Sequence, residues 1–242
     1  MVPRVFLMKK ARPGGEIAVQ PEEIVFRIIT IEREYGCGGA AIAQKLAQQL
    51  KWKLWDQSLT QEIADLANVD CSAVERHNER LDSRLYRLGK VFWRGSYERA
   101  IPLDASATFD ADCMVAMMEK ISDKIAREGN AVVVGRGAPY FLRGRNDTFH
   151  VFLYAPHEEK IRRLLATGLD ESEAHEFVET VDRERIAYVK HYFGADWPTR
   201  SLYHLMINTS VGDSNVIATI IDAMRRLDSR GNYSITEMRG VR

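Results

Sequence analysis

One stretch near the start of the chain, residues 25–51, limits the possible folds more than any other. Residues 25–31 form a nearly continuous apolar run rich in β-branched side chains, which is typical of a strand buried on both faces of a parallel sheet. A loop with three glycines follows, and residues 40–51 then carry apolar side chains at helical spacing. The stretch predicts a buried strand, a glycine loop and an amphipathic helix in direct succession.

The remainder of the chain alternates between short apolar runs and helical patterns. Further short strands are predicted at residues 53–56, 131–134, 149–154 and 204–208. Helices are predicted at residues 59–67, 73–88, 112–128, 156–166, 170–192 and 213–227. Strands that alternate with helices form a parallel sheet covered on both faces, because each crossover helix packs back against the sheet. We therefore expect an α/β fold with five parallel strands and helices on both faces.

Prolines and glycines separate one large domain from two tails. Residues 1–22 contain three prolines and two glycines and are predicted to be a flexible leader. Residues 228–242 are predicted to be a loose C-terminal tail. Residues 23–227 form the expected domain, since a chain of this length can bury a full hydrophobic core without disulfides or metals.

The balance of charges and the few cysteines argue against several classes of protein. Lysine and arginine total 34, and aspartate and glutamate also total 34, so the formal net charge is zero. Such a chain is a poor candidate for a general binder of nucleic acid or anionic membrane.

Three scattered cysteines argue against a disulfide framework and a zinc site. No apolar run reaches the roughly 20 residues that span a bilayer, and the N-terminus is not a convincing signal peptide. We expect a cytoplasmic protein, with its oligomeric state left open.

The glycine loop has the layout of a phosphate-binding loop. Glycines let a phosphate approach the backbone, and the N–H groups at the start of the following helix point toward it. The expected phosphate-binding residues are Gly36, Cys37, Gly38, Gly39 and Ala40. Against the pattern G-x-x-x-x-G-K-[ST], Arg33 stands at the first glycine, Gly39 at the lysine and Ala40 at the hydroxyl residue. A tight turn in which the glycines serve only packing is the alternative interpretation.

Four segments, residues 29–43, 54–56, 132–138 and 182–210, match one family in the same order. They resemble the cytidylate-kinase-like family, a branch of the P-loop nucleoside monophosphate kinases in which the loop lysine is typically missing. Residues 29–43, Ile-Thr-Ile-Glu-Arg-Glu-Tyr-Gly-Cys-Gly-Gly-Ala-Ala-Ile-Ala, are similar to the opening of that family. Residues 54–56 resemble its second strand, and residues 132–138 resemble its Val-Ile-Val-Gly-Arg motif. Residues 182–210 resemble its lid and last strand.

The resemblance covers residues 25 to about 225 and implies the architecture of the domain. It implies a P-loop NTPase-like sheet, with residues 58–128 as a helical acceptor-binding insertion and residues 168–200 as a helical lid. The chain departs from the family at Ala40, where an arginine is common, and at Cys37, where a serine is usual.

Two arginines at the expected ligand edge of the sheet are candidates for binding phosphate. Arg33 lies inside the loop and is the first candidate to replace the missing lysine, with a solvated loop arginine as the alternative. Arg136 lies between two glycines directly after a predicted strand, at the edge where parallel sheets bind ligands. The resemblance implies that Arg136 holds the acceptor monophosphate, and a planar guanidinium suits that contact. A structural ion pair is the alternative for Arg136.

Three further cations lie on the predicted helix at 170–192. The resemblance implies that Arg183, Arg185 and Lys190 belong to a lid that closes on the transferring phosphoryl group. The alternative is a charged helix exposed to water, whose ion pairs contribute little to stability.

Two carboxylates and one thiol complete the candidate site. Asp56 follows the second strand and either binds the sugar or base of the acceptor or caps the next helix. Glu32 ends the first strand and either holds magnesium through water or pairs with a neighbouring arginine. Cys37 is either a redox-sensitive thiol with a pKa lowered by the helix N-terminus or simply a small loop residue.

The resemblance implies ATP-dependent phosphoryl transfer to a nucleoside monophosphate, with CMP or dCMP as the expected acceptor. That chemistry needs positioning and charge neutralisation more than covalent catalysis, which suits a site rich in arginines. ATP and Mg²⁺ are the expected donor and cofactor, and small-molecule nucleotides are the expected partners. The missing lysine and Ala40 keep two alternatives open: a non-catalytic nucleotide-binding regulatory module, and a kinase for a non-nucleotide acceptor.

Overall fold

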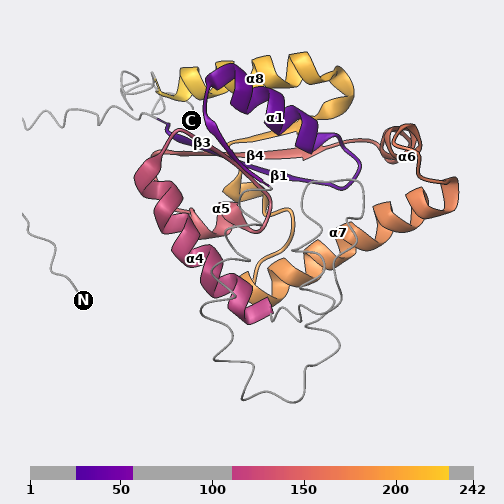
Figure 1. Cartoon of the computed structure of the whole chain (residues 1–242), viewed down its shortest axis with the longest axis horizontal. Coiled ribbons are helices and arrows are strands. Elements are labelled where there is room, and N and C mark those ends of the chain that lie inside the picture. The colour runs from indigo at the N-terminus through magenta and orange to yellow at the C-terminus, as the bar shows by residue number, and fades with distance from the viewer. Residues whose placement is uncertain (1–25, 57–110, 229–242) are drawn as a thin grey trace, which may run out of the picture.

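The computed structural model describes residues 26–56 and 111–228, and its centre is a single parallel sheet. The strands are β1 Ile28–Arg33, β2 Lys53–Trp55, β3 Ala131–Val134, β4 Thr148–Tyr154 and β5 Leu205–Asn208. They pair in the order β2-β3-β1-β4-β5, and every pair is parallel (Figure 1). Strand β1 lies between β3 and β4 and is buried over its whole length, which explains its continuous apolar run. The predicted five-stranded α/β sheet is confirmed.

Helices cover both faces of this sheet. They are α1 Gly39–Leu50, α4 Ala111–Glu128, α5 Ala138–Phe141, α6 His157–Ala166, α7 Glu171–Phe193 and α8 Asp213–Asp228, with 3₁₀ turns at Arg200–Leu202 and Thr209–Val211. Figure 1 shows α1 and α8 on one side of the sheet and α4, α5 and α7 on the other. This layered arrangement is the P-loop NTPase-like fold that the sequence predicts.

The sheet packs a separate hydrophobic cluster on each face, because side chains alternate along a strand. On the face covered by α1 and α8, Ile29 and Ile31 pack with Leu46 and Ile220. On the opposite face, Ile28 packs with side chains from α4 and α7. A smaller cluster joins α6 to α7. Strand β1 belongs to both large clusters, so the loop at its carboxyl end starts from the most rigid part of the domain.

Helix α7 is one continuous helix with clear signals at both ends. Asp170 accepts a hydrogen bond from the N–H of Glu173, and the Glu173 side chain accepts one from the N–H of Asp170, which forms a capping box. Gly194 ends the helix in a left-handed conformation, as glycine commonly does. The single long helix predicted at 170–192 is therefore confirmed.

The other predicted elements within the described residues are also found, with ends that differ slightly. Strand β1 begins and ends later than predicted. Helix α5 is four residues long, and it was not predicted because one turn is too short to show helical periodicity. The predicted leader at 1–22, the helices at 59–67 and 73–88 and the tail at 228–242 lie outside the described residues, apart from residue 228. Among the described residues, no helix is long and apolar enough to cross a membrane.

Candidate phosphate-binding site

Residues 34–38 connect β1 to α1 and form the predicted glycine loop. Gly36 and Gly38 adopt φ angles of 75° and 78°, a region that residues with a Cβ rarely occupy. Gly38 caps α1 without any side-chain hydrogen bond. None of the backbone hydrogen bonds among the described residues uses the N–H groups of Gly36, Cys37 or Gly38. These N–H groups lie at the positive end of α1, an arrangement that binds phosphate.

The side chain of Arg33 fills the space in which a side chain at position 39 would begin. A Cβ built on Gly39 would lie 2.9 Å from Cγ and 3.0 Å from Cβ of Arg33. At the far end of the same side chain, a Cβ built on Gly135 would overlap Nη1 of Arg33. Glycines at these two positions let the Arg33 side chain run from β1 past the start of α1 to the loop after β3. Gly39, which stands where a lysine is usual, thus leaves free the space that the Arg33 side chain occupies.

Four charged side chains are buried where these loops meet. Glu32, Arg33, Asp56 and Arg136 are only 4%, 6%, 6% and 7% exposed. Burial lowers the pKa of Arg33, and the nearby Arg185 lowers that pKa further. Burial also lowers the pKa of Arg136 to about 10, although Asp56 opposes the shift. Two desolvated arginines beside the glycine loop suit the binding of an anion, and such perturbed groups are typical of functional sites.

Arg136 is held in an unusual backbone conformation. Gly135, Arg136 and Gly137 all have positive φ angles, of 66°, 58° and 71°. For a residue with a side chain this region costs about 1–2 kcal/mol, and such strain is found most often at functional sites. The tight turn leaves Arg136 buried beside Asp56 and Tyr188. Its predicted position at the carboxyl edge of the sheet agrees with the structure, while its contact with an acceptor stays a prediction.

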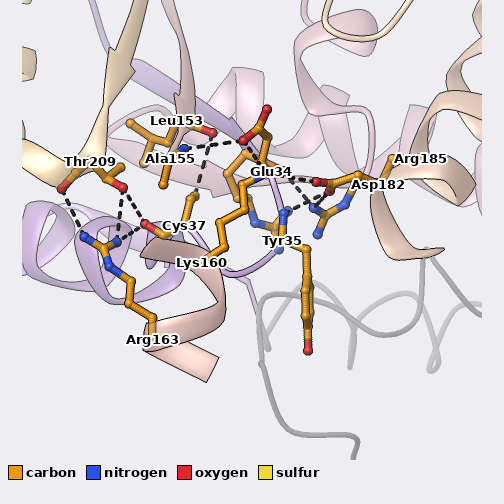
Figure 2. Close-up of polar contacts among 11 residues, drawn as sticks. Glu34, Tyr35, Cys37, Leu153, Ala155, Lys160, Arg163, Asp182, Arg185 and Thr209 are labelled. Atoms are coloured by element: carbon orange, nitrogen blue, oxygen red, sulfur yellow. Dashed lines mark hydrogen bonds and ion pairs between the residues drawn. The ribbon is translucent and has the colours of Figure 1, made fainter. Parts of the chain in front are cut away.

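Helix α7 contacts the loop through Asp182 and Arg185 (Figure 2). Oδ1 of Asp182 accepts hydrogen bonds from the N–H of Tyr35 and from Nη1 of Arg185, each at 2.9 Å. Nη1 of Arg185 also donates to the carbonyl of Arg33 at 2.8 Å. Arg185 therefore lies beside the loop, as expected for a residue of the phosphate site, and its guanidinium is bound to the loop backbone.

Helix α6 contacts the same loop through Lys160. Nζ of Lys160 lies 2.6 Å from Oε2 of Glu34 and 3.6 Å from Oδ2 of Asp182 (Figure 2). Oε2 of Glu34 also accepts a hydrogen bond from the N–H of Ala155 at 3.4 Å. The Lys160 side chain is only 9% exposed, so this ion pair differs from the solvent-exposed pairs that contribute little to stability.

A second residue of α6, Arg163, lies against the loop on its other side. Its Nη1 donates to the carbonyl of Cys37 and, at 3.1 Å, to Oγ1 of Thr209. Its Nη2 donates to the carbonyl of Thr209 at 3.0 Å. A Cβ built on Gly38 would lie 2.5 Å from Nη1 of Arg163. The guanidinium therefore joins the loop to the turn after β5 (Figure 2).

Sequence reasoning missed the roles of Lys160, Arg163 and Asp182. Helix α6 has the sequence His-Glu-Glu-Lys-Ile-Arg-Arg-Leu-Leu-Ala, in which Arg162 and Arg163 look equivalent. In the structure both arginines pair with Glu159, but the Arg162 side chain is 73% exposed, whereas Arg163 also reaches the loop. No signal in the local charge pattern separates these two arginines, because both could belong to a solvated helix face.

The thiol of Cys37 is buried rather than reactive. Cys37 is fully buried, and burial raises its pKa to about 12. Its Sγ donates a weak hydrogen bond to the carbonyl of Leu153 at 3.7 Å. Reactive thiols have a lowered pKa and partial exposure, so the redox-sensitive interpretation is wrong. The alternative of a small loop residue agrees with the structure.

Two of the predicted lid cations lie apart from the buried cluster. Arg183 and Lys190 are both exposed on α7. Nζ of Lys190 lies 3.4 Å from Oδ1 of Asp196, with 65% of the lysine side chain exposed. The structure therefore brings Arg185 to the loop but not Arg183 or Lys190, and the roles of all three in a lid stay predictions.

Glu32 is the residue best suited to hold magnesium. Its Oε2 is buried and has no hydrogen-bond partner among the described residues. Burial raises the pKa of Glu32, whereas Arg33 and Arg185 lower it. No group of three or more metal-ligating side chains is found in residues 26–56 and 111–228. One carboxylate together with water and phosphate oxygens fits Mg²⁺, which retains several waters when it binds.

Two proteins with related sequences are cytidylate kinases. A cytidylate kinase from Methanosarcina mazei is 25% identical over 155 residues, which are 60% of this chain and 86% of that protein. A cytidylate kinase from Methanopyrus kandleri is 25% identical over 146 residues, which are 56% of this chain and 76% of that protein.

A solved structure shares the fold, and a family profile covers most of the chain. The crystal structure of an uncharacterized protein from Eubacterium ventriosum is similar with a TM-score of 0.58 at 24% identity, covering 82% of this chain and 98% of that one. Residues 28–211, from the first residue of β1 to the turn after β5, match the profile of the cytidylate kinase-like family. Because that match extends over the whole sheet and every loop of the site, this chain belongs to the cytidylate kinase-like family.

Proposed function

We propose that this protein transfers the terminal phosphoryl group of ATP to a nucleoside monophosphate, with CMP or dCMP as the acceptor. The observation that carries the proposal is the buried pair of Arg33 and Arg136, which meet beside the glycine loop at the carboxyl edge of the sheet. A kinase must hold two phosphate groups together, and these desolvated cations suit that task. The cytidylate kinases with related sequences support the class of acceptor.

The donor phosphates would lie on the glycine loop. The N–H groups of residues 36–40 and the positive end of α1 would bind them, and Arg33 would supply the cation that is missing at Gly39. Residues 168–200, built around α7, would act as a lid that excludes water and so suppresses ATP hydrolysis. Arg183, Arg185 and Lys190 are the proposed phosphate ligands of that lid.

The acceptor would bind next to the loop after β3. Arg136 would hold its phosphate in a bidentate contact, and Asp56 would contact its sugar or base. Residues 58–128 are the proposed acceptor-binding insertion, of which residues 58–110 lie outside the described residues, and its side chains would determine which base fits.

The reaction itself makes modest demands on the protein. A phosphate oxygen of the acceptor forms a bond to the γ-phosphorus of ATP, and the bond from that phosphorus to the bridging oxygen of ADP breaks. The acceptor phosphate is already largely ionised at neutral pH, so no general base is needed. The chain must bring two anions into line against their mutual repulsion, which explains the buried arginines. Bound Mg²⁺ would neutralise phosphate charge, and Glu32 would hold it through water.

ADP release from Mg-ATP, measured across a panel of nucleoside monophosphates with a control lacking acceptor, tests the proposal. A rate that rises with one or two pyrimidine monophosphates would support the kinase and name the acceptor. A flat panel combined with intact ATP binding would contradict it. The glycine and alanine at positions 39 and 40 would then favour the regulatory module or a non-nucleotide acceptor.

Arg136→Ala separates these possibilities further. In a kinase the substitution should raise the KM of the acceptor by about a hundredfold, since a charge-assisted bidentate contact is lost, while ATP binding is largely kept. Arg143→Ala removes an exposed arginine from the loop after α5 and serves as the control. Equal effects of the two substitutions on acceptor use would contradict the proposed role of Arg136.

A further inference from the structure

Asp182 makes the contacts that tie α7 to the first residues of the glycine loop. Its Oδ1 accepts the N–H of Tyr35 at 2.9 Å, and it also accepts Nη1 of Arg185, which in turn donates to the carbonyl of Arg33 at 2.8 Å (Figure 2). The backbone at residues 33–35 is therefore bound by a carboxylate and a guanidinium from the same helix. Tyr35 and Asp182 are 147 residues apart in the sequence, so their contact depends on the fold and not on local chain geometry.

This pair differs from an ordinary ion pair on a helix surface. Asp182 and Arg185 have the i,i+3 spacing of Glu159 and Arg162 on α6, and the two carboxylates are similarly covered, but Arg185 is only 11% exposed against 73% for Arg162. Nζ of Lys160 lies 3.6 Å from Asp182 as well. A largely covered carboxylate between two cations and a backbone N–H is held in position, because each group loses its compensation if another moves.

The contacts also determine which N–H groups remain for a ligand. The Tyr35 N–H is taken by Asp182, so the run of N–H groups open to an anion begins at Gly36. Gly36 itself is held close to α6, since a Cβ there would lie 3.0 Å from Cβ of Lys160. N–H groups that converge on one point repel each other until an anion arrives. Contacts from outside the loop are therefore needed to keep it ready for phosphate.

We infer that Asp182 is a positioning residue, which with Arg185 and Lys160 holds the glycine loop in its phosphate-binding conformation from helices α6 and α7. The inference rests on the proposed phosphate-binding function of the loop. Helix α7, which carries the proposed lid, would then also determine the conformation of the donor-phosphate site.

Hydrogen exchange and nucleotide binding, measured on the full chain, test this role. The variants are Asp182→Ala, Asp182→Asn and a control, Asp147→Asn, whose carboxylate pairs with Arg145 at 2.8 Å just before β4. Amide exchange is followed at residues 33–38, and ADP binding is measured by calorimetry well below the melting temperature of each variant. ADP serves as the probe because its binding needs no turnover.

Asp182→Ala should speed exchange at Tyr35 and weaken ADP binding by about tenfold, because a charge-assisted hydrogen bond to the loop is lost. Asp182→Asn retains an oxygen that can accept the Tyr35 N–H and should weaken ADP binding by only about threefold, since the acceptor is no longer charged. The control should match the wild-type protein in both measurements. If Asp182→Ala does not fold, the Asn variant decides alone.

Wild-type ADP affinity in a folded Asp182 variant would overturn the inference, even if that variant melts earlier, because a merely structural aspartate would behave in that way. Failure of the proposed function looks different. A wild-type protein that binds ADP but phosphorylates no acceptor would contradict the kinase and leave the variants to decide the role of Asp182. A wild-type protein that binds no ADP would overturn the inference together with the donor site.

Discussion

At the scale of single residues, the site consists of side chains that fit one another rather than of independent ligands. Judged alone, Gly39 removes the lysine on which a phosphate loop usually depends. In the structure, the space beside Gly39 belongs to Arg33, and so does the space beside Gly135. In the proposed site the cation would come from the end of β1 instead of the start of α1, while the helix N-terminus that attracts phosphate is kept. Positions 33 and 39 therefore need to be tested together.

Exchange of these two residues is the direct test. Arg33→Gly should lower kcat/KM for ATP by about a hundredfold, because the donor site loses its buried cation. Gly39→Lys alone should also be impaired, since its Cβ would lie 2.9 Å from Cγ of Arg33. The double variant should regain much of the lost activity, because a lysine at 39 can enter the space that Arg33 leaves.

Steady-state kinetics with saturating acceptor would measure these effects. Arg143→Gly, an exposed arginine replaced in the same way, is the matched control and should retain wild-type activity. A double variant whose fold-loss equals the product of the two single fold-losses would show that the two positions act independently.

The backbone strain at Arg136 leads to a second prediction at the residue scale. Its φ of 58° suits glycine better than alanine. Arg136→Gly and Arg136→Ala both remove the guanidinium, so the difference between them isolates the backbone. Arg136→Gly should be the more stable variant by about 1 kcal/mol, and both should lose acceptor binding. Urea denaturation would measure the difference; equal stability would mean that the turn relaxes once the side chain is gone.

At the scale of elements, the strands could be predicted from the sequence and the helix rotations could not. Buried parallel strands have a signature in their continuous apolar runs, and parallel topology places their following residues at one edge. That reasoning located Arg33, Asp56 and Arg136. Lys160 and Asp182 lie on helices whose orientation is set by packing of α6 against α7. Sequence alone does not distinguish a charge turned toward the loop from one turned toward water.

Strands β1 and β4 share a contact between Thr30 and His150 that we expect to depend on pH. Nδ1 of His150 lies 2.7 Å from Oγ1 of Thr30, and the His150 ring stacks on that of His204. His150 is 3% exposed, and burial, with a smaller effect of His204, lowers its pKa to about 4. In the unfolded chain His150 takes up a proton near pH 6.5, whereas in the folded chain it does so only near pH 4. The contribution of neutral His150 to the free energy of unfolding is therefore complete above about pH 6.5 and decreases as the pH falls toward 4.

The expected loss of unfolding free energy is about 2 kcal/mol between pH 7.5 and pH 5. Urea denaturation at these two pH values would measure it. Replacing both partners, His150→Phe with Thr30→Val, removes the titrating ring without leaving a buried hydroxyl unpaired. This double variant should show a clearly smaller pH dependence over the same range. An unchanged dependence would assign the effect to groups other than His150.

At the scale of the whole molecule, the first and last residues that the structure describes contact each other. The N–H of Phe26 donates to Oδ1 of Asp228 at 2.9 Å, across 202 residues of sequence. Phe26 is 7% exposed, and its ring packs edge-on against Phe149 at 5.2 Å between centroids. The last residues before β1 thus cap the core next to the end of α8. The domain bounds at residues 23–227 stay a prediction, and these contacts add Asp228 to the residues that the domain is expected to need.

Truncation tests these bounds. A protein of residues 23–228 should keep the melting temperature and the ADP affinity of the full chain, since it retains both Phe26 and Asp228. A protein of residues 28–228 should lose about 3 kcal/mol of unfolding free energy, the usual cost of removing a buried phenylalanine side chain. Phe26→Ala in the full chain should cost a similar amount if the loss comes from that side chain. Were residues 23–228 already less stable than the full chain, part of residues 1–22 or 229–242 would have to pack on the domain, and its bounds would move outward.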